Sequence, residues 1–265
     1  MSSLEQFSLK GKSALVTGAA GYLGSAMSIA LADAGAHVIL NVRSFARGEE
    51  LLRSIEARGG SAEILELDVC DEYAVQDYFS HRAPRALHVL VNNAYKGSGG
   101  TIETSMAADY LDTYQVAMVA AHNMLKCALP ALRRAVHESG DASVINVGSM
   151  YGVVSPDGRV YDSPAATNPP FYGATKAALI QWSRYAACEF GPEGIRVNAI
   201  SPGPFPSVAV QKDAPEFVDR LASKVPLGRI GQAHEIAGPI LFLASSAASF
   251  VNGLNLSVDG GWTAW

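Results

Sequence analysis

The amino-acid sequence predicts an α/β protein built on a doubly wound, parallel, seven-stranded sheet with helices on both faces. Short runs rich in β-branched residues alternate with longer segments of helical periodicity along the whole chain. Several of these runs are apolar throughout, as expected of strands that helices cover on both sides. No linker, repeat or low-complexity segment interrupts the pattern, so residues 1–265 are expected to form a single domain.

The first half of the chain supplies four of the expected strands. Residues 13–18, SALVTG, predict a strand, and the helix after it repeats apolar residues from Leu23 until Gly35 ends the pattern. A second strand over 37–42 precedes a helix over 46–60. Strands over 62–67 and 87–93 follow, separated by a polar helix from Glu72 to His81.

The second half supplies three further strands, over 143–149, 195–201 and 254–260. A long helical region runs from Ser105 to Val136, and Pro130 is expected to kink or end its regular part. Another helix contains Tyr172 and extends to about Phe190. Ligands of such sheets bind beyond the carboxyl ends of the strands, so candidate functional residues are expected there.

Composition excludes several classes of partner. A net charge of −5 without a basic stripe argues against nucleic acid, and no apolar run is long enough to span a membrane. Cys70, Cys127 and Cys188 are far apart and predict small buried thiols in a reducing compartment, so a cytoplasmic protein is expected. The six histidines lack ligand spacing, and no metal is expected. Only 17% of residues are charged, which predicts surface buried between subunits.

The segment TGAAGYLG joins the first strand to the first helix. Gly18, Gly21 and Gly24 let the backbone approach a phosphate, and the free N–H groups of the helix start, around Tyr22 and Leu23, favour an anion. An ordinary tight turn is the alternative. The position between a strand and an apolar helix favours nucleotide binding.

The second strand ends in ILNVRS. NAD-binding folds often place an acidic residue near this end to bind the adenosine ribose, but Val42 stands roughly there. Arg43 follows, and its planar guanidinium suits a 2′-phosphate. NADP(H) is therefore favoured over NAD(H), with a solvated arginine as the alternative.

Tyr172 and Lys176 stand four residues apart at the start of a predicted helix, so their side chains share one face. A nearby cation favours the phenolate and lowers the tyrosine pKa, which would suit proton transfer nearer neutral pH. Ser149 ends the fifth strand, at the same edge of the sheet. Separately, each residue also fits an ordinary structural role: a strand-end serine, a half-buried tyrosine and a solvated lysine.

As a set, these features closely resemble the short-chain dehydrogenase/reductase family, over nearly the whole chain. The supporting segments are TGAAGYLG, LDV at 67–69, NNA at 92–94, NVGS, YGATK, IRVNAISPGP and the terminal VDGGW. The resemblance implies a Rossmann-type fold, a nicotinamide cofactor, a small carbonyl or alcohol substrate and a homo-tetramer or homo-dimer. The length and the VDGGW ending resemble the compact, single-domain branch.

The same resemblance assigns roles to individual residues. Tyr172 would be the general acid/base, Lys176 would bind the nicotinamide ribose and lower the tyrosine pKa, and Ser149 would hold the substrate oxygen. The remaining cofactor contacts would be Asp68 and Val69 beside the adenine, Asn92 and Ala94 along the ribose, and Pro202 and Gly203 beside the nicotinamide.

Three departures from the family pattern stand out. Tyr22 replaces a usual glycine, and the resulting glycine spacing resembles the extended, nucleotide-sugar branch; the tyrosine would pack over the pyrophosphate or line the entrance. Ala117 stands where the long helix normally supplies a relay asparagine, so a water or another side chain substitutes, or turnover is slow or absent. The interval from Ser149 to Tyr172 is longer than usual by several residues.

That longer interval predicts a loop over about 152–171, because it is rich in Pro, Asp, Ser and Asn. It is expected to border the substrate pocket, with a subunit contact or surface excursion as the alternative. Its polar side chains suit a hydroxylated substrate: Asp157, Arg159, Tyr161, Asp162 and Asn168. A second segment, about 203–232, holds one short amphipathic helix and is predicted to form a mobile lid.

The leading hypothesis for function is an NAD(P)(H)-dependent oxidoreductase that interconverts a carbonyl and a secondary alcohol, such as a sugar or polyol derivative. The glycine spacing around Tyr22 raises a second hypothesis, a nucleotide-sugar epimerase or dehydratase. The alanine at position 117 raises a third, a catalytically weak or inactive nucleotide-binding protein.

Overall fold

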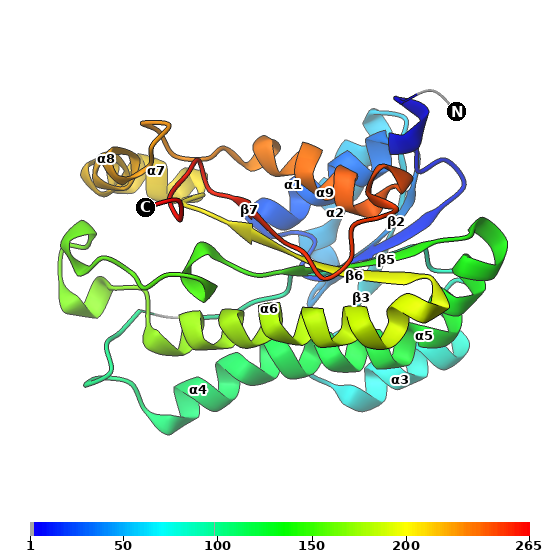
Figure 1. Cartoon of the computed structure of the whole chain (residues 1–265), viewed down its shortest axis with the longest axis horizontal. Helices are drawn as coiled ribbons and strands as arrows, with labels where there is room; N and C mark the ends of the chain where they lie inside the picture. The colour runs from blue at the N-terminus through cyan, green and yellow to red at the C-terminus, as the bar shows by residue number, and fades with distance from the viewer. Residues whose placement is uncertain (1–2, 98) are drawn as a thin grey trace.

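The computed structural model describes residues 3–97 and 99–265, and its centre is a seven-stranded parallel sheet (Figure 1). The strands are β1 (Ser13–Val16), β2 (His37–Val42), β3 (Ser61–Glu66), β4 (Val89–Asn92), β5 (Ala142–Val147), β6 (Ile195–Pro202) and β7 (Asn255–Val258). Their order across the sheet is β3-β2-β1-β4-β5-β6-β7. The direction of winding reverses between β1 and β4, and this switch point opens a crevice at the carboxyl ends of the strands. The predicted fold class is confirmed.

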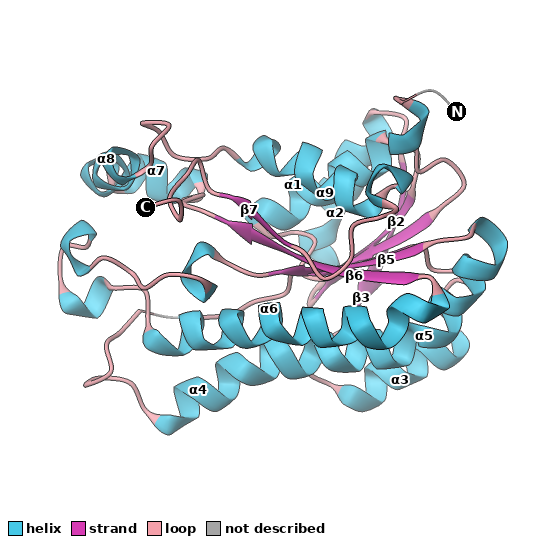
Figure 2. Cartoon of the chain, in the orientation of Figure 1, coloured by secondary structure: helices cyan, strands magenta, loops and turns pink. Residues whose placement is uncertain are grey.

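Helices cover both faces of the sheet (Figure 2). They are α1 (Tyr22–Asp33), α2 (Phe45–Ala57), α3 (Glu72–His81), α4 (Ala107–Tyr114), α5 (Ala120–Ser139), α6 (Pro170–Phe190), α7 (Val208–Asp213), α8 (Pro215–Lys224) and α9 (Ala237–Ala244). In Figure 1, α1, α2 and α9 lie on one face, and α3, α5 and α6 lie on the other.

The core consists of two apolar layers that share the sheet. Along β4, successive side chains alternate between the layers, as the two-residue period of a strand requires. Val89 and Val91 pack with Met27 of α1 and the apolar side of α9, whereas Leu90 packs with Leu125 of α5. Burial on both faces explains why this strand is apolar throughout, and the shared sheet fixes where its carboxyl end lies.

The long helical region departs from expectation at two places. Pro130 does not end it: α5 continues to Ser139 and stops at Gly140, whose φ is 80°. Ala128, Ala131 and Leu132 bury their side chains in the core around the proline, and this packing outweighs one missing N–H donor. The irregularity lies earlier, in a π-helical turn over Gln115–Val119 that joins α4 to α5.

The three thiols are free, but they are not the small buried groups that the sequence predicted. Cys70 and Cys127 are partly exposed and Cys188 is exposed, because these positions lie at the boundary of the helical layers and not inside them. Among the described residues, no helix combines the length and apolar character needed to cross a membrane.

Candidate active site

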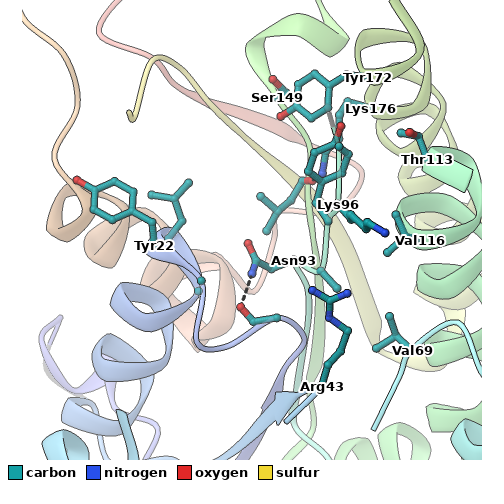
Figure 3. A pocket seen from close by; sticks show the side chains of 18 of the residues that line it. Tyr22, Arg43, Val69, Asn93, Lys96, Thr113, Val116, Ser149, Tyr172 and Lys176 are labelled. Atoms are coloured by element: carbon teal, nitrogen blue, oxygen red, sulfur yellow. Dashed lines mark hydrogen bonds between the residues drawn. The ribbon is translucent and has the colours of Figure 1, made fainter. Parts of the chain in front are cut away.

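A cleft of about 870 Å³ opens at the carboxyl ends of the strands, where the winding of the sheet reverses (Figure 3). Nearly all of the residues predicted from the sequence line it. They are Gly18, Gly21, Tyr22, Leu23, Gly24, Arg43, Asp68, Val69, Ala94, Ser149, Tyr172, Lys176, Pro202 and Gly203. Asn92 does not line this cleft.

The glycine turn after β1 has the geometry of an anion cradle. Gly18 has a φ of 62°, which favours glycine, and a Cβ on Gly24 would overlap the carbonyl oxygen of Gly18. Asn93 clamps the turn against β4 by donating to the carbonyl oxygens of Thr17 and Gly18 at 3.0 and 3.1 Å. No side chain caps the start of α1 at Gly21, so the first-turn N–H groups face the cleft. The turn therefore fits a phosphate.

Two arginines line the cleft where β2 ends. Arg43 follows the strand and Arg47 lies on the first turn of α2 (Figure 3 labels Arg43). Arg47 is a residue that the sequence reasoning missed, although its spacing of four from Arg43 was the available signal. The β2 end offers Asn41 and Val42 where an acidic residue would bind ribose hydroxyls.

Tyr172, Lys176 and Ser149 meet where β5 ends. Pro170 occupies the first helical position of α6, so Tyr172 lies in the first turn and Lys176 one turn later. The Lys176 ammonium is buried and donates to the carbonyl oxygen of Val147 at 2.6 Å. Ser149 hydrogen-bonds the Tyr172 phenol and accepts from the Tyr151 N–H at 3.1 Å. Figure 3 shows all three side chains at one end of the cleft.

The electrostatics of this cluster differ from the sequence expectation. Burial raises the pKa of Tyr172, and the hydrogen bond with Ser149 opposes that rise. The ammonium of Lys176 lies 5.9 Å from the centroid of the Tyr172 ring and donates to the carbonyl oxygen of Val147. In the ligand-free site burial dominates, so the net shift of the tyrosine pKa is upward, and the lowering of this pKa by Lys176 stays a prediction. Burial also lowers the pKa of Lys176 to about 8.

Asn92 was expected along the cofactor ribose but is buried beneath the cleft. Its amide donates to Asn146 Oδ1 at 2.8 Å, Asn146 donates to Ser183 Oγ at 2.8 Å, and Ser183 donates to the Leu179 carbonyl at 2.7 Å. Successive strand residues point to opposite sides, so only one residue of the NN pair can face the glycine turn. That residue is Asn93.

Ala117 lies in the π-helical turn and lines a small cavity of about 10 Å³ with Asn92 and Lys176. The Ser183 hydroxyl donates to Leu179, so Asn146 must donate to Ser183 and Asn92 must donate to Asn146. The Oδ1 of Asn92 is left without a hydrogen-bond partner in the described chain. The space approximates one water molecule, and the free oxygen would accept from it.

The loop over 152–171 does not present its polar side chains to the cleft, where only Phe171 contributes. Asp157 pairs with Arg159 and with Lys224 of α8, and Asp162 pairs with Arg220 of α8. Tyr161 shares a hydrogen bond of 2.8 Å between hydroxyls with Tyr151. None of the five predicted side chains, Asn168 included, lines the cleft, so the expected substrate contacts are not seen. The two carboxylates pair with α8 instead, and Tyr161 bonds to Tyr151.

Polar groups on the cleft wall come instead from α4 and the turn after it. Asp109, Asp112, Thr113 and Gln115 line the cleft, together with Tyr95 and Lys96 from the segment after β4. Asp109, Asp112 and Thr113 share one face of α4, at spacings of three and four. That spacing was visible in the sequence, but which face met the cleft depended on packing against α6.

Tyr22 joins the glycine turn to the predicted lid. Its hydroxyl accepts from the Gln211 side chain of α7 and from the Ala233 N–H, each at 3.3 Å. Phe205, at the start of the same segment, lines the cleft. Figure 3 shows Tyr22 on the opposite side of the cleft from Tyr172. Tyr22 therefore lines the cleft beside the predicted lid, and its two expected positions, over the pyrophosphate or at the entrance, both stay predictions.

No cluster of three or more potential metal ligands occurs within residues 3–97 and 99–265. A cleft at the switch point, lined both by a turn that fits a phosphate and by a phenol near an ammonium, is typical of a dinucleotide-dependent enzyme.

Comparisons with known proteins identify the family of this chain. A family profile described as Enoyl-(Acyl carrier protein) reductase matches residues 18–263. The chain is 33% identical to 2,5-dichloro-2,5-cyclohexadiene-1,4-diol dehydrogenase LinX of Sphingobium indicum, covering 96% of this chain and 97% of that protein. It is 32% identical to gluconate 5-dehydrogenase of Gluconobacter oxydans, covering 99% of each. The chain therefore belongs to the short-chain dehydrogenase/reductase family and is an oxidoreductase of that family.

Solved structures that are similar to this chain support the same family. The RhlG/NADP complex of Pseudomonas aeruginosa superposes with a TM-score of 0.87 at 29% identity, covering 97% of this chain and 98% of that chain. A gluconate 5-dehydrogenase of Burkholderia cenocepacia, in complex with NADP and tartrate, gives a TM-score of 0.85 at 30% identity over 100% of both chains.

Proposed function

We propose that this oxidoreductase uses NADP(H) to interconvert a ketone and a secondary alcohol on a neutral, hydroxylated molecule such as a keto-sugar or polyol. The observation that carries the proposal is the meeting of Ser149, Tyr172 and Lys176 in the same cleft that the glycine turn lines. In this proposal the three residues form the catalytic set.

The nicotinamide, when bound, supplies or accepts the hydride. Tyr172 holds the proton that the substrate oxygen receives during reduction, since burial keeps the phenol protonated at neutral pH. Ser149 orients that oxygen through its hydroxyl, and Lys176 keeps two N–H donors beyond its bond to Val147, one of which is free for the coenzyme ribose. Oxidation uses the same groups in reverse.

The remaining coenzyme contacts follow the lining of the cleft. Gly18, Gly21, Leu23 and Gly24 would hold the pyrophosphate, and Tyr22 would close the entrance beside it. Asp68, Val69 and Ala94 would line the adenosine half, and Pro202 and Gly203 would lie beside the nicotinamide.

Preference for NADP(H) over NAD(H) rests on the arginines at the end of β2. Arg43 and Arg47 would bind the 2′-phosphate, and Asn41 and Val42 leave no carboxylate there to repel it. The two solved relatives described above were crystallised with NADP, which supports the same choice.

A water molecule is proposed to replace the missing relay asparagine. The cavity beside Ala117 has room for one water, and Asn92 Oδ1 and Lys176 line it. Such a water would accept a hydrogen bond from Lys176 and donate one to Asn92. This arrangement favours an active enzyme over an inactive nucleotide-binding protein.

The substrate class rests on the part of the cleft wall that comes from α4 and the turn after it. Thr113 and Gln115 offer hydrogen bonds to hydroxyl groups, and Asp109 and Asp112 would disfavour an anionic substrate. Gluconate 5-dehydrogenase and the cyclic diol dehydrogenase LinX act on hydroxylated molecules by their names, which supports a hydroxylated substrate.

The second candidate function, a nucleotide-sugar epimerase or dehydratase, rests on the spacing of Gly18, Gly21 and Gly24 alone. The hydroxyl of Tyr22, which creates that spacing, bonds to Gln211 and Ala233 at the lid, so the spacing has a local structural use. The compact dehydrogenases among the relatives favour the first candidate.

One experiment tests the proposal. NADPH and NADH oxidation would be followed across a panel of keto-sugars, sugar acids and simple ketones, with mass spectrometry of the products. Stoichiometric alcohol formation with NADPH is expected, and Arg43→Ala should raise the KM for NADPH about tenfold, since charged hydrogen bonds to a phosphate contribute about 1.5–3 kcal/mol. Product without net NADPH consumption would establish the second candidate instead, and a preference for NADH unaffected by Arg43→Ala would overturn the coenzyme assignment.

A further inference from the structure

Tyr95 stands beside the proposed catalytic pair, in the segment after β4, and none of the roles described so far uses it. Its ring lies edge-on to the Tyr172 ring, with centroids 4.8 Å apart and an interplanar angle of 70°. The Lys176 ammonium lies 5.3 Å from the centre of the same ring. We propose that Tyr95 is a positioning residue that holds the Tyr172 phenol and the Lys176 ammonium in their working arrangement. The inference rests on the proposed function.

The contact with Tyr172 restricts where the phenol can point. An edge-to-face pair at this separation is attractive because the positive ring edge meets a negative face. Tyr172 is held on another side by the hydrogen bond with Ser149. With the ring of Tyr95 against it, the phenol cannot rotate away from Ser149 without losing both contacts.

The contact with Lys176 offsets part of the cost of burying a charge. The ammonium donates a hydrogen bond to the carbonyl oxygen of Val147, and the centres of the Tyr95 and Tyr172 rings lie 5.3 and 5.9 Å from it. Burial alone accounts for its lowered pKa. Aromatic faces favour the charged form of a lysine, so Tyr95 opposes the lowering of the Lys176 pKa by burial. The other ionisable side chains that line the cleft are Tyr22, Arg43, Arg47, Asp68, Cys70, Lys96, Asp109 and Asp112.

The ring of Tyr95, and not its hydroxyl, makes these contacts. The hydroxyl lies against the α-carbon of Gly97, where a Cβ would overlap it. The sequence Tyr-Lys-Gly therefore lets the side chain fold back over its own backbone and bring the ring under the ammonium. Burial and the nearby Tyr172 raise the pKa of Tyr95, so the hydroxyl stays protonated and does not compete for the charge.

The test compares Tyr95→Phe with Tyr95→Leu and Tyr95→Met in the full-length enzyme, with Tyr73→Leu on exposed α3 as the matched control. Three quantities are measured: the kcat for ketone reduction, the Kd for NADPH, and the dependence of that Kd on pH between 7 and 9.5. The Phe variant keeps the ring and should stay within about twofold of wild type. Leu and Met should lower kcat about tenfold and move the alkaline loss of NADPH affinity down by roughly half a pH unit.

Two results would overturn the inference: Leu and Met variants indistinguishable from wild type, or a Phe variant as impaired as they are, which would place the effect in the hydroxyl. Thermal unfolding shows whether a variant is folded, and two non-aromatic replacements guard against failure of either one. Tyr172→Phe is assayed beside them. If it is inactive while Tyr95→Leu is unaffected, only the inference about Tyr95 fails; if Tyr172→Phe is fully active, the proposed function itself fails.

Discussion

At the residue scale, the site depends on what burial does to two ionisable groups. Tyr172 is kept protonated by its surroundings, and Lys176 titrates near pH 8 for the same reason. In the proposed function, the phenol with its raised pKa would give a proton during reduction, whereas the lysine would bind the coenzyme only while charged. The sequence identified both residues through their spacing, but it could not reveal that burial outweighs the charge of Lys176 at the tyrosine, because burial is a property of the fold.

This balance predicts a pH dependence of NADPH binding. Lys176 has a folded-state pKa lowered to about 8, so its ammonium is present below that pH and is lost as the pH rises through it. The Kd for NADPH should therefore be constant from pH 6.5 to 7.5 and rise about tenfold by pH 9, as measured by fluorescence titration. Lys176→Met should bind weakly at every pH. Arg43→Ala should also bind NADPH weakly, but its Kd should still rise with pH. A wild-type Kd that does not change with pH would refute the role of the Lys176 ammonium in NADPH binding.

At the element scale, α8 and the loop over 152–171 form one structural unit. Arg220 donates to the carbonyl oxygen of Val160 at 2.7 Å and pairs with Asp162, while Lys224 pairs with Asp157 at 2.6 Å. The ring of Tyr161 packs on Phe217 with centroids 5.5 Å apart. The sequence predicted a polar loop and a nearby amphipathic helix, but it could not predict their mutual pairing, because residues about 60 positions apart meet only in the folded chain.

Removing one member of this unit should loosen both segments together. Arg220→Leu deletes a hydrogen bond to the carbonyl of Val160, worth about 1 kcal/mol, and the pair with Asp162. Hydrogen exchange should become about fivefold faster in both 156–168 and 215–224, because each segment loses its partner. Arg53→Leu, which breaks an exposed pair on α2, is the control and should change neither segment. Faster exchange confined to α8 would show that the two segments open independently.

At the scale of the whole molecule, one sheet joins the two apolar layers, which supports the proposal that residues 1–265 fold as a single domain. The doubly wound parallel sheet, the helices on both of its faces and a site at the carboxyl ends of the strands were predictable, because an alternation of apolar strands and helices admits few topologies. The side chains that line the crevice were harder to predict. Tyr95 and Arg47 follow motif residues by one and four positions, and only the folded backbone turns them inward.

Exposed apolar side chains on the surface of the molecule bear on its oligomeric state. Large apolar side chains remain exposed on α4 and the segment before it, including Ile102, Met106 and Leu111. Such a patch is typical of a subunit interface, and we propose a homo-oligomer, with a tetramer favoured. Light scattering after gel filtration should give a multiple of the 27.9 kDa chain mass, and Leu111→Asp should lower it. Leu4→Asp, at another exposed site, should leave the mass unchanged, and a wild-type monomer would refute the proposal.

The most direct test of the account is the effect of Tyr172→Phe on ketone reduction. The variant lacks only the phenolic oxygen, so the contact with Tyr95 and the burial of Lys176 should persist. We predict a kcat at least about a hundredfold below wild type, with the Kd for NADPH within threefold, because proton transfer is lost while coenzyme binding is kept. A Tyr172→Phe enzyme that reduces the same ketone at the wild-type rate would contradict the central claim that this phenol supplies the proton.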